Sequence, residues 1–475
     1  MLLKELGKEL TKEESNISLG FHIASGESIL SLLLRGDIST INLKVFPVLN
    51  HFFAIGTLRR KNGAKFPTII LNVPAFLETN IFNHPGFMLE KINPSTKTVG
   101  TISQNPIFIG EKSSCGIDNI DYIKHSMIIG GSGTGKSKLL ELFVNRISDF
   151  NNNSHIILID PHGEFENINL GKTVNFVDNY IEPFASEDKS PKSTELIVDL
   201  IIGSLEAKNP YVERVLYYTI HFLNTKNKLD FDNLQSLLTD QIFRKESMME
   251  CKDDEIRRFF EIEYLEIYTQ RFDEVILPIL NFISEYKLYL KTKNKKKESL
   301  KKLIENNKIT VISLNPSFFG KRMIKFLGGS IIHQMYIMAV SGKFKEKNMI
   351  LVVDEFPRVE SKTVINILSE CRKFNLGLYL SMQYLNQINK NIIDSILTNV
   401  FNYYIFKVNK EDAKILNSVL DIKLDPVFEQ NKSSKEIEIL KEEMLTGLDQ
   451  RECIVKIFDG QIIYDPVKLR TVDVI

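Results

Sequence analysis

A glycine-rich run near residue 130 has the residue types that hold phosphate groups. Gly130-Gly-Ser-Gly-Thr-Gly-Lys-Ser137 matches the pattern Gly-x-x-x-x-Gly-Lys-Ser/Thr at every position. In such a loop the backbone N–H groups point at phosphate oxygens, the lysine reaches the β- and γ-phosphates, and the final hydroxyl helps to hold Mg²⁺. The run therefore predicts a site for ATP and Mg²⁺, formed by Gly130, Gly131, Ser132, Gly133, Thr134, Gly135, Lys136 and Ser137.

An acidic pair at Asp354 and Glu355 could supply the remaining chemistry. The pair follows the apolar run Met349–Val353, which has the character of a buried strand. Asp354 would hold Mg²⁺ through water, and Glu355 is placed to orient and deprotonate an attacking water. Acids after a strand also cap helix N-termini, but the glycine-rich loop favours the hydrolytic interpretation. A simple nucleotide kinase is disfavoured, because a water-activating glutamate would be wasteful there.

The elements that must position these residues follow from apolar runs. The strand-like Ser126–Ile129 precedes the glycine-rich loop, Ser137–Ile147 after it has helical spacing, and Ile156–Asp160 is a second buried strand. Both neighbours that the phosphate motif requires are therefore present, which argues against a chance glycine-rich turn. Apolar runs separated by helices are typical of parallel strands covered on both faces. Further strand-like runs are Ile309–Leu314, Met349–Val353, Gly377–Ser381 and Tyr403–Val408.

The domain organisation is predicted from where the alternation of strand-like and helical segments stops and where it resumes. Residues 190–308 have almost wholly helical spacing, in Leu196–Ser204, Val212–Leu223, Asp254–Tyr268 and Val275–Leu288. We therefore expect an α/β fold of four parts: a small N-terminal α+β domain of unknown role (1–117), the first part of the ATPase core (118–189), an all-α insertion (190–308), and the second part of the core (309–475). The last part contains a hairpin, because Cys453–Phe458 and Gln461–Tyr464 flank Asp459-Gly460.

Composition excludes some classes of protein but does not identify one. Lys+Arg and Asp+Glu both number 60, so no global field attracts nucleic acid, although a ring needs positive charge only on its inner wall. The four cysteines have no paired spacing, which disfavours a disulfide framework or a zinc site and favours a reducing cytoplasm. We expect no transmembrane segment, because no run approaches the ~20 apolar residues that a spanning helix needs. The lysine-rich stretch 291–302 predicts a solvated helix end or loop, with a nucleic-acid role left open.

Three further segments carry a resemblance to a known family. They are Asp160-Pro-His-Gly-Glu164, Leu368-Ser-Glu-Cys-Arg372 and Leu380-Ser-Met-Gln383. Together with the glycine-rich loop and the acidic pair, they resemble the HerA/FtsK superfamily of hexameric DNA-pumping ATPases. The match is closest to the type IV secretion coupling-protein branch, which pumps DNA in conjugation, and it spans roughly residues 120–470. The resemblance implies a RecA-like P-loop core with a mostly parallel sheet and helices on both faces.

The resemblance also implies roles for individual residues. Gln383 corresponds to a polar sensor of the γ-phosphate, and Arg372 to an arginine that reaches a neighbouring subunit's site. With Glu355 and Lys136 they form the expected catalytic set. The residue types alone also allow a strand-end amide at Gln383 and a helix-surface arginine at Arg372.

The segment after the second strand is expected at the phosphate edge of the sheet. The resemblance implies that Asp160 and Glu164 lie beside the nucleotide and couple its hydrolysis to neighbouring subunits or DNA. His162 between them lacks the companions that a metal ligand would need.

The function expected from the resemblance is an ATP-hydrolysing homo-hexameric translocase that pumps DNA, single- or double-stranded, in conjugation or type IV secretion. Coupling proteins usually carry N-terminal membrane helices, which this sequence lacks. We therefore expect either a partner that anchors the motor at the inner face of the membrane, or a free cytoplasmic motor. One alternative is a HerA-like translocase with a nuclease partner, in end processing or phage defence; a relaxase partner would instead favour conjugation. A nucleotide-gated scaffold without translocation is an alternative of another class.

Overall fold

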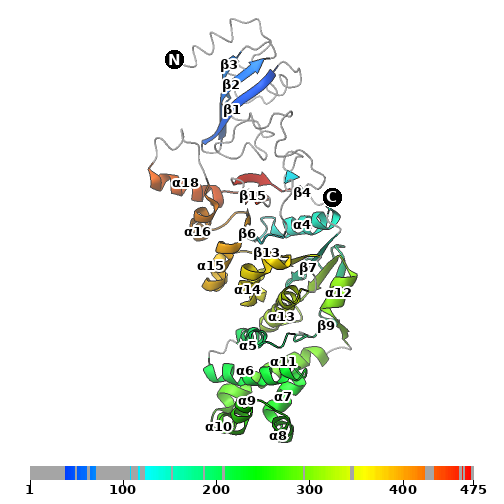
Figure 1. Ribbon diagram of the computed structural model, residues 1–475. Coiled ribbons are helices and arrows are strands. Elements are labelled where there is room, and N and C mark those ends of the chain that lie inside the picture. Colours follow the sequence, from blue (N-terminus) through cyan, green and yellow to red (C-terminus); the bar gives the residue numbers. More distant parts are fainter. Residues whose placement is uncertain are drawn as a thin grey trace. The chain divides into compact units, whose positions relative to one another are not determined.

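The computed structural model describes residues 123–471 apart from short gaps at 151–152, 186–187, 206–208, 292–294, 343–346, 423–432, 459–462 and 464–465. Before residue 123 it describes the backbone of five strands. The chain divides into two compact units, Met1–Phe150 with Phe401–Ile475, and Asn151–Val400. Each unit is described in turn below, and Figure 1 labels their elements.

Three strands near the N-terminus form an antiparallel sheet of their own. They are β1 (Ile38–Val48), β2 (His51–Arg60) and β3 (Lys65–Ile70), in the order β1-β2-β3. Two short strands, β4 (Ile107–Phe108) and β5 (Gly116–Ile117), pair antiparallel. The rest of 1–117 lies outside the described residues, so the α+β domain expected there stays a prediction.

The remainder of the first unit places the glycine-rich loop between a strand and a helix. Strand β6 (Ser126–Ile129) is wholly buried and leads through the loop into α4 (Lys136–Phe150). β6 pairs parallel with β14 (Asn402–Ile405), and β15 (Glu452–Lys456) and β16 (Val467–Arg470) follow antiparallel. Helices α16 (Lys410–Leu420) and α18 (Ser434–Thr446) connect β14 to β15.

The predicted C-terminal hairpin is present, but its second strand is shifted along the chain. β15 pairs with Val467–Arg470, whereas the prediction placed the second strand at Gln461–Tyr464. Only a single antiparallel bridge, Phe458 with Ile463, is described in the predicted stretch. The Asp459-Gly460 turn lies outside the described residues. Asp-Gly is a local signal for a turn, whereas the register of the pair is set by burial of Cys453 and Leu469 on one face.

The second unit contains five parallel strands whose carboxyl ends meet at one edge. They are β7 (Ser154–Asp160), β8 (Lys172–Asn175), β11 (Ile309–Ser313), β12 (Asn348–Val353) and β13 (Leu376–Met382), in the order β13-β12-β7-β11-β8. Nearly every residue of β7, β11, β12 and β13 is buried, as parallel strands covered on both faces require. Together with β6, β14, β15 and β16 they are the strands of one mostly parallel nine-stranded sheet, which confirms the predicted α/β fold.

A group of helices separates β9 (Asn179–Ile181) from β11, and Figure 1 shows most of them in green. Side chains of Asn209, Asp230, Asp240 and Asp253 cap four of these helices at their N-termini. The lysine-rich stretch is more regular than predicted, because Lys296–Glu298 forms β10, parallel to β9. The helices are α5 (Pro191–Leu205), α6 (Pro210–Thr225), α7 (Phe231–Thr239), α8 (Gln241–Met249), α9 (Asp254–Arg258), α10 (Tyr264–Gln270), α11 (Leu277–Lys291) and α12 (Leu300–Asn306), with π-helical turns at Phe259–Glu263 and Phe272–Ile276.

Helix α13 (Lys321–Val340) is the central helix of the second unit. Its Phe326 ring lies 5.6 Å from Phe231 and 5.0 Å from Phe282, which ties it to the inserted helices through an aromatic cluster. Among the described residues it is the one helix long and apolar enough to cross a membrane by length and composition alone. However, 83% of its apolar window is buried inside the protein, and a buried core helix passes the same test.

Candidate nucleotide site

The glycine-rich loop is closed by hydrogen bonds of its own residues. Lys136 Nζ donates to the Gly131 carbonyl at 2.9 Å, and the Thr134 hydroxyl donates to the same oxygen at 2.8 Å. The Lys136 side chain is only 6% exposed and therefore lies folded over the loop. These contacts give the loop the compact shape that the phosphate motif predicts.

Glycine is required at two positions of the loop for different reasons. A Cβ on Gly130 would lie 2.5 Å from Phe406 Cβ, closer than two carbon atoms can approach. Gly133 has open space around it, but its φ of +74° is in the left-handed region that favours glycine. The loop is thus a cradle that side chains would fill or distort, which fits a bound phosphate.

Residues far along the chain hold the loop from the outside. The Gly131 N–H donates to the Lys407 carbonyl at 2.9 Å, and the Arg451 N–H donates to the Thr134 carbonyl at 2.8 Å. Gln450 Nε2 reaches the Gly133 carbonyl at 3.1 Å. Gln450 and Arg451 were not predicted from the sequence, because no local pattern marks a residue whose partner lies 317 positions away.

The second unit gathers carboxylates at the carboxyl edge of its strands. Asp160 ends β7, and Asp354 follows β12, whose Val353 is in register with Ile159 of β7. Asp354 is 1% exposed, and its Oδ1 has no hydrogen-bond partner among the described residues. Burial raises the pKa of Asp354 to about 7, and the negative charges of Glu355, Glu164 and Asp160 add to that rise.

Asp160 shapes the loop that follows it. Its carboxylate accepts hydrogen bonds from the N–H groups of His162 at 3.1 Å, Gly163 at 2.8 Å and Phe165 at 2.8 Å. Burial raises the pKa of Asp160, and these N–H donors oppose that rise. Glu164 is exposed in the same loop. The nucleotide contact expected of Asp160 and Glu164 stays a prediction, whereas the loop-shaping role of Asp160 is seen directly.

Glu355, expected to activate water, and Gln383, which the resemblance implies is a phosphate sensor, are brought together. Gln383 Nε2 donates to Glu355 Oε1 at 2.8 Å. Glu355 has φ of 42°, so this non-glycine residue is held in the left-handed region at the start of the 3₁₀ turn Phe356–Val359. Such strain persists only where the surroundings enforce it, and it concentrates at functional sites.

Arg372 lies in the 3₁₀ turn η6 (Cys371–Phe374), immediately after helix α14 (Thr363–Glu370). Its side chain lies outside the described residues, so its predicted role as a finger stays a prediction. Glu370, two residues before Arg372, has side-chain partners in two other helices, Lys192 and Tyr336.

The residues present suit Mg²⁺. Asp354 offers a buried carboxylate oxygen that has no hydrogen-bond partner among the described residues, and Ser137 carries a half-buried hydroxyl in the first unit. In the described part of the chain, no group of three or more His, Cys, Asp or Glu side chains could hold a metal by itself. This pattern fits Mg²⁺, which is usually held by one or two protein oxygens together with phosphates and water.

Comparison with known proteins agrees with these features. Residues 110–319 match the family model described as "Helicase HerA, central domain". None of the curated proteins matches the sequence. The unbound "bacterial conjugative coupling protein TrwBdeltaN70" is similar in structure, with a TM-score of 0.55 and 12% identity over 78% of this chain and 90% of that one.

Two further solved structures are similar. VirB4 of Thermoanaerobacter pseudethanolicus has a TM-score of 0.50 and 13% identity, over 79% of this chain and 98% of that one. The "plasmid coupling protein TrwB in complex with the non-hydrolysable GTP analogue GDPNP" has a TM-score of 0.51 and 12% identity, over 74% of this chain and 86% of that one. At such low identity these likenesses establish the fold.

Proposed function

We propose that this chain, whose residues 110–319 match the HerA central domain, is a HerA/FtsK-type P-loop ATPase that hydrolyses ATP to move DNA through a ring of six copies. The process served would be conjugation or type IV secretion, in the cytoplasm or at the inner face of the membrane. The fold shared with a conjugative coupling protein supports this pathway. The observation that carries the hydrolytic part is the hydrogen bond from Gln383 to Glu355 at the edge of the parallel strands.

The chain's own residues divide the chemistry between them. The N–H groups of the glycine-rich loop and the Lys136 ammonium bind the phosphates. The Glu355 carboxylate orients a water molecule and accepts its proton, while the Gln383 amide keeps that carboxylate in place. Mg²⁺ held by Asp354 and Ser137 would neutralise charge on the phosphates. Arg372 of a neighbouring copy stabilises charge on the transferred phosphoryl group, as arginine fingers do.

A ring follows from head-to-tail contacts that close by rotation. DNA would be gripped mainly through its phosphates, so its binding weakens steeply with salt. The proposal includes a partner protein, which would be a membrane anchor, a relaxase or a nuclease. It leaves open whether the DNA is single- or double-stranded. A nuclease partner would place the motor in end processing or phage defence.

The test is the steady-state ATPase rate of the full chain, alone and with single- or double-stranded DNA. We expect DNA to stimulate hydrolysis, and Lys136→Ala to abolish both the basal and the stimulated rate. Glu355→Gln should remove hydrolysis while ATP still binds, with Glu438→Gln on the exposed face of α18 as the control that keeps full activity.

Two outcomes would contradict parts of the proposal. Robust hydrolysis that ignores DNA would remove the DNA substrate and point to a protein substrate. Absent hydrolysis under all conditions, with ATP still bound, would replace the motor by a nucleotide-gated scaffold.

A further inference from the structure

Helices α5 and α14 are tied together at two points. Lys192 Nζ contacts both carboxylate oxygens of Glu370, at 2.9 and 3.1 Å. At the other end, Lys362 Nζ contacts Asp199 Oδ1 at 2.6 Å. On α5, Lys192 and Asp199 are two turns apart. On the other helix, Lys362 precedes α14 and Glu370 is its last residue. The two helices therefore run in opposite directions, with one ion pair at each end of α14.

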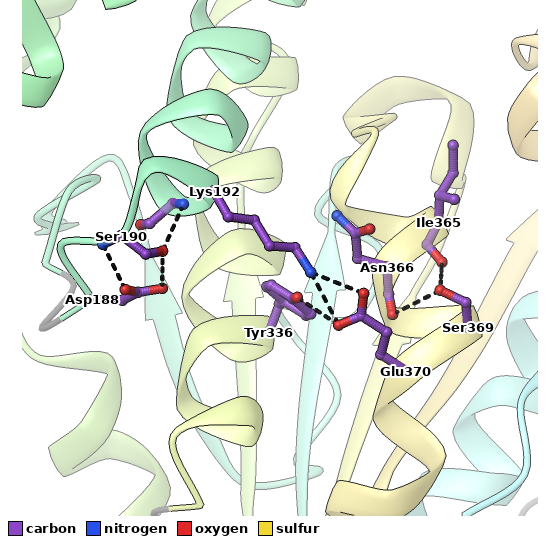
Figure 2. A network of polar contacts seen from close by, with 9 residues as sticks. Asp188, Ser190, Lys192, Tyr336, Ile365, Asn366, Ser369 and Glu370 are labelled. Carbon is purple, nitrogen blue, oxygen red and sulfur yellow. Dashed lines mark hydrogen bonds and ion pairs between the residues drawn. The ribbon is translucent and has the colours of Figure 1, made fainter.

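The tie at Glu370 involves a third helix. Figure 2 shows Lys192 of α5, Tyr336 of α13 and Glu370 of α14 pointing toward one another. The Tyr336 hydroxyl donates to Glu370 Oε2 at 2.9 Å, and Lys192 Nζ lies 5.4 Å from the centre of the Tyr336 ring. Through these hydrogen bonds the pKa of Lys192 is raised and that of Glu370 is lowered, so both stay charged.

The start of α5 is also fixed, which holds Lys192 in place. The Ser193 N–H donates to Ser190 Oγ at 3.2 Å, so Ser190 caps the helix, and Pro191 occupies its first position. Asp188 in turn accepts hydrogen bonds from the backbone and the hydroxyl of Ser190, at 2.8 and 3.1 Å. Figure 2 shows this chain of contacts beside the three-helix cluster.

This cluster is poorly suited to stabilising the fold. The Lys192 and Glu370 side chains are 48% and 35% exposed, and an ion pair at such a surface contributes only about 0–1 kcal/mol. Its location suggests another role. Glu370 is the last residue of α14, and the next turn carries Arg372.

We propose that Lys192, Tyr336 and Glu370 are positioning residues that hold the turn of Arg372, so that the inserted helices set the rate of hydrolysis through α5. The proposal rests on the function proposed above, in which Arg372 acts in a neighbouring subunit's site. A displacement of α5 by the substrate or a partner breaks the ties to Glu370, and the Arg372 turn then loses its fixed position.

The first experiment separates positioning from folding. Lys192→Met keeps the aliphatic stem and removes the charge. We expect kcat to fall about tenfold, since small misplacements of a catalytic group have effects of this order, while KM for ATP stays unchanged. The charge-swapped double variant, Lys192→Glu with Glu370→Lys, restores most of the loss because the ion pair is re-formed in reverse.

The matched control is another ion pair of similar exposure within the inserted helices. Arg214 and Glu263 lie 2.8 Å apart and are 46% and 41% exposed. Arg214→Met removes a surface ion pair that joins α6 to the π-helical turn Phe259–Glu263 and leaves both ion pairs between α5 and α14 in place, so kcat stays at the wild-type value. An equal loss in Arg214→Met and Lys192→Met would overturn the proposal.

A second measurement does not depend on activity. Amide hydrogen exchange over residues 363–374 should be faster in Lys192→Met than in the wild type, while exchange in α4 is unchanged. Unaltered exchange over 363–374 would overturn the proposal even in an active enzyme. A wild-type chain without ATPase activity would instead refute the proposed function, and the exchange result would still decide whether the tie holds the turn.

Discussion

The backbone and the side chain of Glu355 are each held in a defined position. Its backbone is in the left-handed region, which costs of the order of 1 kcal/mol or more for a residue with a Cβ. Its carboxylate accepts a hydrogen bond from the Gln383 amide at 2.8 Å. Strain fixes the backbone and the amide fixes the side chain, so the carboxylate is held in one place before any substrate arrives. Preorganisation of this kind lowers the reorganisation needed during the reaction.

The contact can be tested by removing the amide. In Gln383→Ala the Glu355 carboxylate loses its hydrogen-bond donor and becomes free to rotate, so we expect kcat to fall about 10- to 100-fold with little change in KM for ATP. Steady-state kinetics at saturating Mg²⁺ measures both constants. Gln387→Ala, at an exposed position four residues on, is the control. A Gln383→Ala variant that only raised KM would show that the amide binds substrate and does not position Glu355.

At the scale of elements, helix α13 is built around two adjacent glycines. A Cβ on Gly328 would lie 2.3 Å from Val359 Cγ1, and one on Gly329 would lie 2.5 Å from Leu200 Cδ1. A glycine inside a helix is unfavourable by about 1 kcal/mol relative to alanine. The close approach of Val359 and of α5 explains why glycine is found at both positions, since α13 supports the turn after Glu355 on one side and α5 on the other.

Substitution of Gly328 tests this packing. Gly328→Ala should lower the free energy of unfolding by about 1–3 kcal/mol, because overpacking outweighs the helix propensity gained. Adding Val359→Ala to Gly328→Ala should make the double variant less destabilised than the sum of the two single changes. Urea unfolding measures the free energy of unfolding of the two single variants and of the double variant. The control is Gly203→Ala in α5, where no atom of the described residues lies within 4 Å of the added Cβ and stability should rise. Additive effects of Gly328→Ala and Val359→Ala would refute the close contact.

The elements that the sequence predicts well are those with a strong local pattern. The apolar runs at 309–314, 349–353 and 377–381 correspond to β11, β12 and β13 within one residue at each end. The predicted strand Tyr403–Val408 ends earlier, at Ile405, because Lys407 turns away to bind the Gly131 N–H. β8 was not predicted, since four residues beside Gly171 show little periodicity, and it becomes a strand only by pairing with β11.

In the candidate site, too, only the residues that belong to a local sequence motif could be predicted. The glycine-rich loop, the acidic pair and Gln383 each belong to a recognisable motif, whereas the hydrogen bond between Glu355 and Gln383 was not predicted. Gln450, Arg451 and Lys192 carry none, because their contacts join segments that are distant in sequence. Their roles depend on tertiary packing that no short window of sequence describes.

At the scale of the whole molecule, one buried histidine links stability to pH. His333 in α13 is about 1% exposed, and burial lowers its pKa to about 4, with Asp188 acting in the opposite direction. The native chain therefore keeps this imidazole neutral, while the unfolded chain protonates it near pH 6.5. The stability that His333 contributes is therefore complete above that pH and is lost as the pH falls from about 6.5 to 4.

The expected loss from His333 is up to about 3 kcal/mol over this range. Urea unfolding of the nucleotide-free chain between pH 7.5 and 4.5 measures it. In His333→Leu, this part of the pH dependence should disappear. His221→Gln is the control at a partly exposed position, and it retains the dependence because His333 is still present. An unchanged pH dependence in His333→Leu would assign the effect to other groups.

The outer support of the glycine-rich loop has a consequence for synthesis of the chain. The loop residue Gly131 is made long before Lys407 and Arg451, whose backbones complete the loop. At about 5–20 residues per second, that delay lasts roughly 14 to 55 s for Lys407 and roughly 16 to 64 s for Arg451. During this time the nascent chain displays the whole phosphate-binding motif without the partners that shape it. We therefore expect a chain cut short before β14 to retain the motif in its sequence but to bind ATP poorly, so that broken translation products do not compete with intact subunits for nucleotide.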